Sequence, residues 1–423
     1  MNNNDVLLKV EHLCQYFKMG KKTLKAVDDV NFEIKKGEVF GLVGESGCGK
    51  TTTGRSIIKL YDVTSGNVWF KGVRVCAGIG SYKDAISAKK KETSKKIAEL
   101  KALAKEKPEE AQNINTQIQA AKDECDSFVA EQRKEIASAN HDRKYCDKDH
   151  ADKLIEQVEA EYAPKLAAVQ SDPEQLKKIT KEYKNRLRIA KKSRLTTQIQ
   201  MIFQDPIASL DPRMTVKEII SEGLVINGIT DQKYIDEKVY EILELVGLVR
   251  EHAGRYPHEF SGGQRQRIGI ARAIIMHPEM IIADEPVSAL DVSIQAQVIN
   301  LLNDLRDKLG LTILFIAHNL SVVKYFSDRI GVMYYGKMVE LTTSEELFAH
   351  PLHPYTKSLL SAIPLPDPRT EKTRVRITYN PIAEHDYTED KPTMREIVPG
   401  HFVYCNDAEE IKYKKELGIQ VEQ

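Results

Sequence analysis

The stretch GESGCGKT at residues 44–51 combines the residue types that bind phosphate groups. It fits the template G-x-x-x-x-G-K-[ST], in which glycines let main-chain amides wrap phosphate oxygens and the lysine supplies a cation to the outer phosphates. An apolar segment, VFGLV, precedes it and a helical segment, TTTGRSIIKL, follows it, so the positive end of the helix dipole adds to the attraction. The sequence therefore predicts a nucleotide-phosphate site in which Thr51 is also a magnesium ligand. The predicted binding residues are Gly44, Glu45, Ser46, Gly47, Cys48, Gly49, Lys50, Thr51 and Thr52.

Two adjacent carboxylates end the apolar segment MIIADEP at residues 280–286. In a parallel sheet they would lie at the carboxyl edge, where ligands of such folds bind. There Asp284 is suited to hold Mg²⁺, and Glu285 to orient and deprotonate a water molecule. An Asp-Glu pair after a strand is more often surface charge. The catalytic interpretation therefore depends on the phosphate loop in the same chain.

The segment FSGGQRQR at residues 260–267 offers a second phosphate-binding element. Ser261 supplies a hydroxyl, and Gly262 and Gly263 leave bare amides that can approach a terminal phosphate closely. Gln264 completes the predicted set.

The elements that must position these residues alternate between apolar strands and helices. The sequence of residues 6–75 predicts short strands separated by turns, and a strand-like pattern returns at 198–203. From there to about residue 340, helical segments alternate with the apolar strands MIIAD and TILFIA. This alternation is typical of an α/β fold with a parallel sheet.

Residues 80–195 differ from both flanks, because Lys, Glu, Ala and Gln dominate and apolar residues recur at steps of three and four. Asp172 and Pro173 form a helix start signal. Since apolar positions are few, we expect helices that pack on each other as an antiparallel hairpin or short bundle rather than a second globular domain. Two legs of about 45 residues would reach roughly 65 Å, or less if Pro108 and Pro164 break them.

Charge and cysteine content limit the function classes. The 62 basic and 62 acidic side chains cancel, so whole-chain electrostatics predict no strong attraction to nucleic acid or anionic membranes. The six cysteines form no CxxC pair, and the start of the chain has no secretory pattern, which favours a cytosolic protein with reduced thiols. The apolar runs are strand-length and too short to span a bilayer.

Six motifs in order carry a family resemblance: the phosphate loop, Gln204 in MIFQDP, FSGGQ, IIADEP, SALD at 288–291, and His318 in IAHNL. Together they resemble the ATP-binding cassette of ABC proteins. The resemblance implies a P-loop NTPase fold of the α/β class, with a RecA-like core and a helical subdomain. Phe260, where leucine is commonest in the family, is an apolar replacement that leaves the resemblance intact.

The resemblance also implies roles for single residues. Two cassettes would pair head to tail, so that Lys50 of one faces Ser261 of the other. Gln204 would touch Mg²⁺ and the attacking water, His318 would contact the γ-phosphate, and both join Glu285 as catalytic residues. Asp291 would bridge the two cassettes at the bound ATP. Phe17 aligns with the aromatic residue that stacks on adenine, although an isolated phenylalanine is equally consistent with a core position.

Two further stretches, at residues 203–216 and 350–368, resemble ATPase subunits of oligopeptide, dipeptide and nickel importers. The resemblance covers residues 6–75 and 197–370, is greatest for the oligopeptide importers, and leaves the cargo open. It implies an ATP-hydrolysing subunit on the cytoplasmic face of the membrane, with two permeases, an extracellular peptide-binding protein and a second, similar ATPase chain. Residues 204–225 would hold a short permease helix. Some relatives carry an iron–sulphur cluster, which needs four ligands; the tail has only Cys405, so we expect none.

The alternative is a soluble ABC ATPase of the nucleic-acid or ribosome-acting class that uses the helical insert as an arm. Chromosome-type proteins place their coiled coil after the Q-loop glutamine, whereas this insert precedes Gln204. Translation-type proteins carry two cassettes, whereas this chain has one. We therefore expect no nucleic-acid partner.

The expected organisation has four parts. Residues 1–79 form the first part of the ATP-binding core, 80–195 an inserted helical arm, 196–340 the rest of the cassette with its helical subdomain at about 205–263, and 341–423 a C-terminal extension. The insert has three open interpretations: a solvated appendage, a docking arm for a permease or other protein, or a contact for RNA or a membrane surface through its basic end.

Overall fold

The computed structural model describes residues 5–106, 108–169, 172–363 and 376–419. Its first layer is an antiparallel sheet of four strands in the order β2-β1-β4-β5. These strands are β1 (Val6–Met19), β2 (Lys22–Lys35), β4 (Ser65–Phe70) and β5 (Val73–Ala77). The strands expected within residues 6–75 are therefore confirmed.

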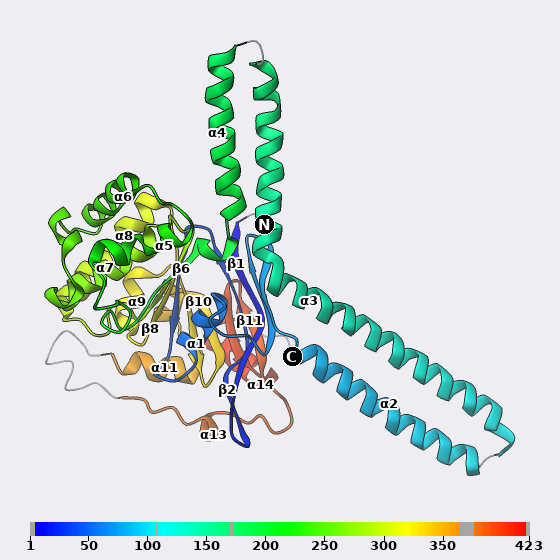
Figure 1. Ribbon diagram of the computed structural model, residues 1–423. Coiled ribbons are helices and arrows are strands. Elements are labelled where there is room, and N and C mark those ends of the chain that lie inside the picture. The colour runs from blue at the N-terminus through cyan, green and yellow to red at the C-terminus, as the bar shows by residue number, and fades with distance from the viewer. Residues whose placement is uncertain (1–4, 107, 170–171, 364–375, 420–423) are drawn as a thin grey trace.

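The second layer is a sheet of eight strands in the order β11-β12-β10-β9-β3-β8-β7-β6 (Figure 1). The order combines a parallel part, from β9 to β6, with an antiparallel part, from β9 to β11. The strands are β3 (Val39–Val43), β6 (Ile199–Ile202), β7 (Met280–Asp284), β8 (Thr312–Ala317), β9 (Arg329–Tyr334), β10 (Lys337–Thr343), β11 (Thr393–Val398) and β12 (His401–Cys405).

The central strands β3, β7 and β8 are buried along their whole length, which explains their uninterrupted apolar sequences. One core lies between the two sheets, and a second lies between the large sheet and the helices on its other face. Because β3, β6, β7 and β8 run parallel, their carboxyl ends meet at one edge, and the residues that follow them are brought together there.

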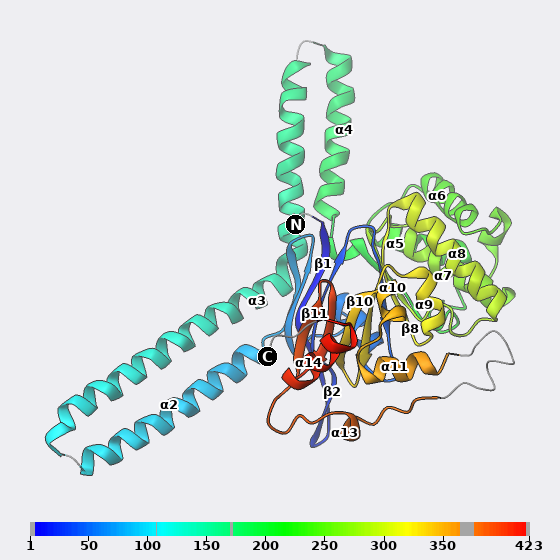
Figure 2. The same ribbon diagram turned by 180° about the vertical axis from the view of Figure 1, so that it is seen from behind.

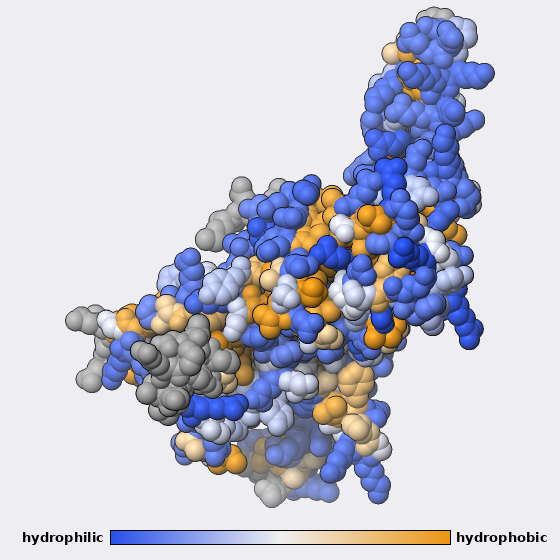
Figure 3. Space-filling model, turned by 90° about the vertical axis from the view of Figure 1, so that its left-hand side faces the viewer, coloured by the Kyte–Doolittle hydropathy of each residue, from blue (hydrophilic) through white to orange (hydrophobic). Residues whose placement is uncertain are grey.

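The helices of the cassette follow the parallel strands or fill the segment between β6 and β7. They are α1 (Lys50–Ile57), α5 (Val216–Ile226), α6 (Gln232–Leu245), α7 (Gly262–Ile274), α8 (Val292–Leu309) and α9 (Leu320–Phe326). Short 3₁₀ turns at Arg250–Gly254 and Pro257–Glu259 join α6 to α7. Figure 3 shows apolar side chains on the face that carries these helices. Val225 and Ile226 at the end of α5 are exposed, as is Ile207 in the segment before it.

The C-terminal region adds β11 and β12 to the antiparallel side of the large sheet. Its helices are α10 (Ser344–Ala349), α11 (Pro354–Ser361), α13 (Pro381–Glu384) and α14 (Asp407–Glu416). Since β10 spans residue 340, the boundary expected there falls inside a strand. This region therefore continues the sheet of the cassette.

The insert consists of three helices that make two hairpins (Figures 1 and 2). They are α2 (Gly80–Glu106), α3 (Ala111–Ala168) and α4 (Pro173–Lys192), with a 3₁₀ turn at Pro108–Glu110. The helix α2 packs on the first part of α3, and α4 packs on its last part, so the two hairpins share one long helix. The expected pair of equal legs is therefore wrong. Pro164 lies inside α3 without ending it.

The middle of α3 is held against the first sheet, and this contact creates two hairpins. The buried Arg74 on β5 donates to Asp142 and to the hydroxyl of Ser138, at 2.8 and 2.7 Å. The amide and the hydroxyl of Thr196 both donate to the Asp147 carboxylate, at 3.0 and 2.8 Å. With its centre fixed, a helix of 58 residues must project at both ends.

Two features of the insert expected from the sequence are confirmed. Of the apolar residues expected to share a helix face, Ile114, Ile118, Ala121 and Cys125 are buried in the seam of the first hairpin, Phe128 is half-buried, and the side chain of Ala111 lies outside the described part. The helix α4 begins at Pro173, and an Asp172 carboxylate oxygen accepts from the amides of Glu174 and Gln175, at 3.0 and 3.2 Å. Local sequence determines these features, because caps and seams depend on residues a few positions apart.

Candidate functional site

The phosphate loop after β3 closes around the buried side chain of Lys50. The lysine Nζ donates to the carbonyl oxygens of Gly44 and Glu45, at 2.8 and 2.9 Å. Gly44 and Gly49 have φ of 150° and 106°, and a Cβ at either would lie 2.2 Å from a neighbouring carbonyl oxygen. The glycines are therefore required for the tight curl, and the lysine is held where the loop amides converge.

Thr51, at the end of this loop, and Asp284, at the end of β7, lie side by side. The Thr51 hydroxyl donates to Asp284 Oδ1 at 2.7 Å. The carboxylate is completely buried, and its Oδ2 has no hydrogen-bond partner among the described residues; the Arg55 guanidinium is 4.0 Å from it. Burial raises the pKa of Asp284, while Thr51 and Arg55 oppose this rise. A buried carboxylate with one unpaired oxygen beside a hydroxyl fits a hard cation.

The three residues predicted to be catalytic meet at one carboxylate oxygen. Gln204 Nε2 donates to Glu285 Oε2 at 3.1 Å, and His318 Nδ1 lies 3.0 Å from the same oxygen. Each residue stands just past the end of its strand, Gln204 after β6, Glu285 after β7 and His318 after β8. The parallel register of these strands therefore brings together residues that are far apart in sequence.

The backbone at Glu285 is strained. Its φ is 44°, in the left-handed region that non-glycine residues rarely adopt. Its amide donates to the carbonyl oxygen of Ile316 on the adjacent strand at 2.9 Å, which holds this conformation. Strain of this kind is typical of functional positions, where the surrounding structure fixes the direction of one side chain.

The segment Ser261–Gln264 begins α7 and forms a capping box. The Ser261 hydroxyl accepts from the Gln264 amide at 3.4 Å, and the Gln264 side chain accepts from the Ser261 amide at 3.1 Å. Within the described residues, no hydrogen bond or ion pair joins this segment to the phosphate loop or to Glu285. The exposed Ser261 and Gly262 thus lie apart from the cluster around Glu285.

Asp291 and Phe17 also keep their functional groups available. Asp291 caps α8 by position, but its side chain makes no capping bond and is exposed. Phe17 on β1 is half-buried and packs edge to face on Tyr61, with ring centroids 5.3 Å apart. It belongs to neither of the two main cores. The assignment of Phe17 to adenine and of Asp291 to a partner cassette stays a prediction.

Sequence reasoning missed two residues at this site. Arg55, in the second turn of α1, lies 4.0 Å from Asp284. Its position four residues after Thr51, the last residue of the phosphate-loop template, is a signal that could have identified it. Tyr355 accepts a hydrogen bond from the amide of Glu45 in the phosphate loop at 2.9 Å. No local signal could show the second contact, because 310 residues separate its partners.

Comparison with known protein families agrees with this geometry. Residues 27–176 and 154–288 match the family model described as ABC transporter, and the two segments together reach from β2 past Glu285. The chain belongs to the ATP-binding family of ABC transporters. The α/β cassette and the ABC resemblance expected from the sequence are confirmed, and the cassette is an ATPase subunit that binds ATP.

The C-terminal region of the cassette has a match of its own. Residues 339–391 match the model described as Oligopeptide/dipeptide transporter, C-terminal region. The cassette is 45% identical to Oligopeptide transport ATP-binding protein OppF of Bacillus subtilis over 404 residues, 95% of this chain and 97% of the relative. It is 42% identical to Dipeptide transport ATP-binding protein DppF of Lactococcus lactis subsp. cremoris, over 97% of both chains.

Among solved structures, the cassette is similar to cbiO1 from Clostridium perfringens, described as part of the ABC transporter complex cbiONQ. The similarity covers 82% of this chain and 91% of the other, with a TM-score of 0.48 and 20% identity. In the described part of the cassette, no helix has the length and apolar character needed to cross a membrane.

Proposed function

We propose that this chain is the ATP-hydrolysing subunit that energises an importer for oligopeptides, bound peripherally to permeases at the cytoplasmic face of the membrane. The observation that carries the proposal is the match of residues 339–391 to the oligopeptide/dipeptide C-terminal region, in a cassette whose relatives over almost its whole length are named for peptide transport. The alternative class of soluble ATPases acting on nucleic acid has no support among these relatives.

The site geometry supports separate roles for the residues that bind phosphate and those that hold Mg²⁺. The loop amides and Lys50 bind the outer phosphates, and Thr51 and Asp284 hold Mg²⁺ together with phosphate oxygens and Gln204. We expect this Mg²⁺ to bind together with the nucleotide, because Mg²⁺ is usually held by one or two carboxylates plus substrate phosphates. The described residues contain no group of three or more His, Cys, Asp or Glu side chains suited to a metal ion. When bound, the ion neutralises charge that develops on the phosphates.

Glu285 orients the attacking water and accepts its proton. Gln204 and His318 contact the same oxygen of Glu285, which fixes the direction of the carboxylate before water arrives. We assign to Ser261, Gly262, Gly263, Gln264 and Asp291 the completion of the ATP site of a second, similar cassette in a head-to-tail pair. The exposure of Ser261, Gly262 and Asp291 supports this assignment, as does the lack, within the described residues, of a hydrogen bond or ion pair between the Ser261–Gln264 segment and the phosphate loop.

A cavity between the large sheet and α5 is the proposed place for a permease segment. Its volume is about 760 Å³, and Met201, Phe203, Ile226 and Met276 give it an apolar lining. Ile226 also borders a second cavity, of about 660 Å³, between α5 and the base of the second hairpin. A permease seated in the first cavity would thus reach the base of the insert, while the hairpin tips lie farther out (Figure 1).

This arrangement predicts that the hairpin tips are dispensable. Joining Lys89 to Glu124, an ion pair at 2.7 Å, through a short turn removes the tip of the first hairpin. Joining Tyr162 to Glu182, whose hydroxyl and carboxylate are 2.9 Å apart, shortens the second. Both variants should keep ATP hydrolysis and copurification with the permeases within about twofold, because the described residues of the segments removed, 90–123 and 163–181, line neither of the two cavities. Loss of permease binding in one variant alone would instead identify that tip as a docking arm.

The proposed function is tested by purifying the chain with its membrane partners and reconstituting them in vesicles. We expect two permeases, a second ATPase and a peptide-binding protein in the complex, and ATP-dependent uptake of labelled oligopeptides. Glu285→Gln in the same complex should abolish uptake while leaving assembly intact. ATP hydrolysis that is stimulated by nucleic acid or ribosomes, without permeases in the preparation, would contradict the proposal.

A further inference from the structure

The C-terminal region reaches the phosphate loop through one side chain. Tyr355 lies in the first turn of α11, is 2% exposed, and its hydroxyl accepts a hydrogen bond from the amide of Glu45 at 2.9 Å. Glu45 is the second residue of the phosphate loop, and its carbonyl oxygen accepts the hydrogen bond from Lys50. One residue of the loop is thus held by the C-terminal region on one side and by the lysine on the other.

The turn that leads into α11 is fixed by a buried carboxylate. Glu340 on β10 accepts hydrogen bonds from the amides of Leu352 and His353, at 2.9 and 3.1 Å. Its Oε1 also lies 2.8 Å from Nε2 of His401 on β12. All these groups are buried, where a lost hydrogen bond is costly. The strand β12 therefore helps to fix the start of the helix that carries Tyr355.

The neutral side chain of His353 caps the first turn of α11. Its Nδ1 accepts a hydrogen bond from the amide of Tyr355 at 3.1 Å. Burial, with a smaller effect of His385 and Lys357, lowers the pKa of His353 to about 3. The ring is neutral at physiological pH and remains an acceptor. The Tyr355 ring packs against both Tyr334 and Tyr379, with centroids 4.4 and 5.5 Å away, so its hydroxyl has a fixed direction.

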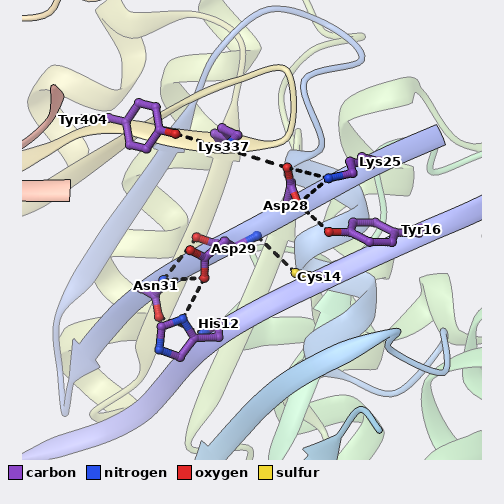
Figure 4. A network of polar contacts seen from close by, with 9 residues as sticks. All are labelled: His12, Cys14, Tyr16, Lys25, Asp28, Asp29, Asn31, Lys337 and Tyr404. Carbon is purple, nitrogen blue, oxygen red and sulfur yellow. Dashed lines mark hydrogen bonds and ion pairs between the residues drawn. The ribbon is translucent and has the colours of Figure 1, made fainter. Parts of the chain in front are cut away.

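The other side of the loop is held by the turn before β10. The amide of Gly336, in this turn, donates to the carbonyl oxygen of Cys48 at 2.9 Å. The next residue, Lys337, donates to the Tyr404 hydroxyl on β12 at 3.0 Å and lies 3.8 Å from Asp28 Oδ2 (Figure 4). Asp28 in turn accepts from the Tyr16 hydroxyl, next to Phe17. The C-terminal strand is thus tied to both sheets around the nucleotide site.

We infer that the C-terminal region positions the phosphate loop for nucleotide, and that Tyr355 is the positioning residue. When Lys50 turns toward phosphate oxygens, its bonds to the carbonyl oxygens of Gly44 and Glu45 weaken, while the Cys48 amide still donates to the Glu45 carbonyl oxygen at 3.3 Å. The Tyr355 hydroxyl, which accepts from the Glu45 amide, is then the contact that holds this residue from outside the loop. Removing this hydroxyl should therefore weaken ATP binding more than it destabilises the nucleotide-free protein. The inference rests on ATP binding at this loop and is independent of the transported cargo.

The test is Tyr355→Phe, which removes the hydroxyl and keeps the ring. ATP affinity is measured by calorimetry on the full chain in a Glu285→Gln background, and KM and kcat are measured in the assembled transporter. We expect Kd and KM for ATP to rise roughly three- to tenfold, the size of one hydrogen bond, with kcat changed less than twofold. The melting temperature without nucleotide should stay within about 2 °C of the parent.

The matched control is Tyr379→Phe, in the same aromatic cluster. The described residues provide no hydrogen-bond partner for the Tyr379 hydroxyl, so this variant should bind ATP normally. Unchanged Kd and KM in Tyr355→Phe would overturn the inference. So would an equal loss of affinity in Tyr379→Phe, or a parallel fall in the nucleotide-free melting temperature, since either marks a general packing effect. Lys50→Ala in the same assay tests separately whether ATP binds at this loop. Retained ATP affinity in Lys50→Ala would contradict the ATP site itself, whereas retained affinity in Tyr355→Phe alone would contradict only the role of Tyr355.

Discussion

Glu285→Gln should lower the rate of ATP hydrolysis by about two to four orders of magnitude, the usual contribution of a positioned general base. The amide keeps the size and shape of the carboxylate, and its oxygen can still accept from Gln204 and His318, now at 3.1 and 3.0 Å from Oε2. It cannot take a proton from water. ATP binding should therefore persist, and the cassette pair should stay closed on bound ATP.

The measurement is single-turnover hydrolysis together with ATP affinity on the same preparation. Glu279→Gln is a matched control, because Glu279 precedes β7, carries the same charge and pairs with Lys71 at 2.6 Å, on the opposite end of the strand from Glu285. This control should keep the parent rate within about twofold. Near-normal hydrolysis in Glu285→Gln would refute the assignment of Glu285 as the base.

Lys50→Ala should weaken ATP binding about ten- to hundredfold. The lysine is the cation of the phosphate loop, and hydrogen bonds to a charged group contribute roughly 1.5–3 kcal/mol. The substitution also removes the bonds from Nζ to Gly44 and Glu45, so the loop itself should become less ordered. Calorimetric titration of ATP into the full chain measures the effect, and thermal melting without ATP reports the state of the fold.

Lys59→Ala is a suitable control for this loss. Lys59 lies just past α1, outside the phosphate loop, and its Nζ contacts the carbonyl oxygen of Arg143 and the Cys146 sulphur of the insert. This variant should loosen the base of the insert without changing ATP affinity. If Lys50→Ala retained its affinity, or if both variants lost it equally, the role of Lys50 in phosphate binding would be excluded.

The structure brings together the three residues that the sequence predicted to be catalytic, because each of them follows an apolar strand; their catalytic role stays a prediction. Gln204, Glu285 and His318 lie just past β6, β7 and β8, and a parallel sheet aligns such positions at one edge. Thr51 and Asp284 were placed together for the same reason. The partner-facing residues, Ser261 and Asp291, show only their exposure in a single chain, so their roles remain predictions.

The shape of the insert was predicted less well. Its seams and the start of α4 follow from spacings of three and four residues, which are local. The division into two hairpins depends on Arg74 and Thr196, which hold the middle of α3 through Asp142 and Asp147. Neither contact has a signature in the sequence, since surface arginines and threonines are common and their partners lie 49 or more residues away.

By itself, the sequence determined the nucleotide chemistry, the parallel sheet whose strands carry it and the helical nature of the insert. These features are encoded in motifs and periodicities whose physical basis is local: amides freed by glycine, strand-length apolar runs and helical faces. Only the tertiary structure showed that α3 is pinned at its centre and that Tyr355 holds Glu45. Both depend on hydrogen bonds between distant segments, whose strength comes from burial and from directions that exist only after the chain has folded.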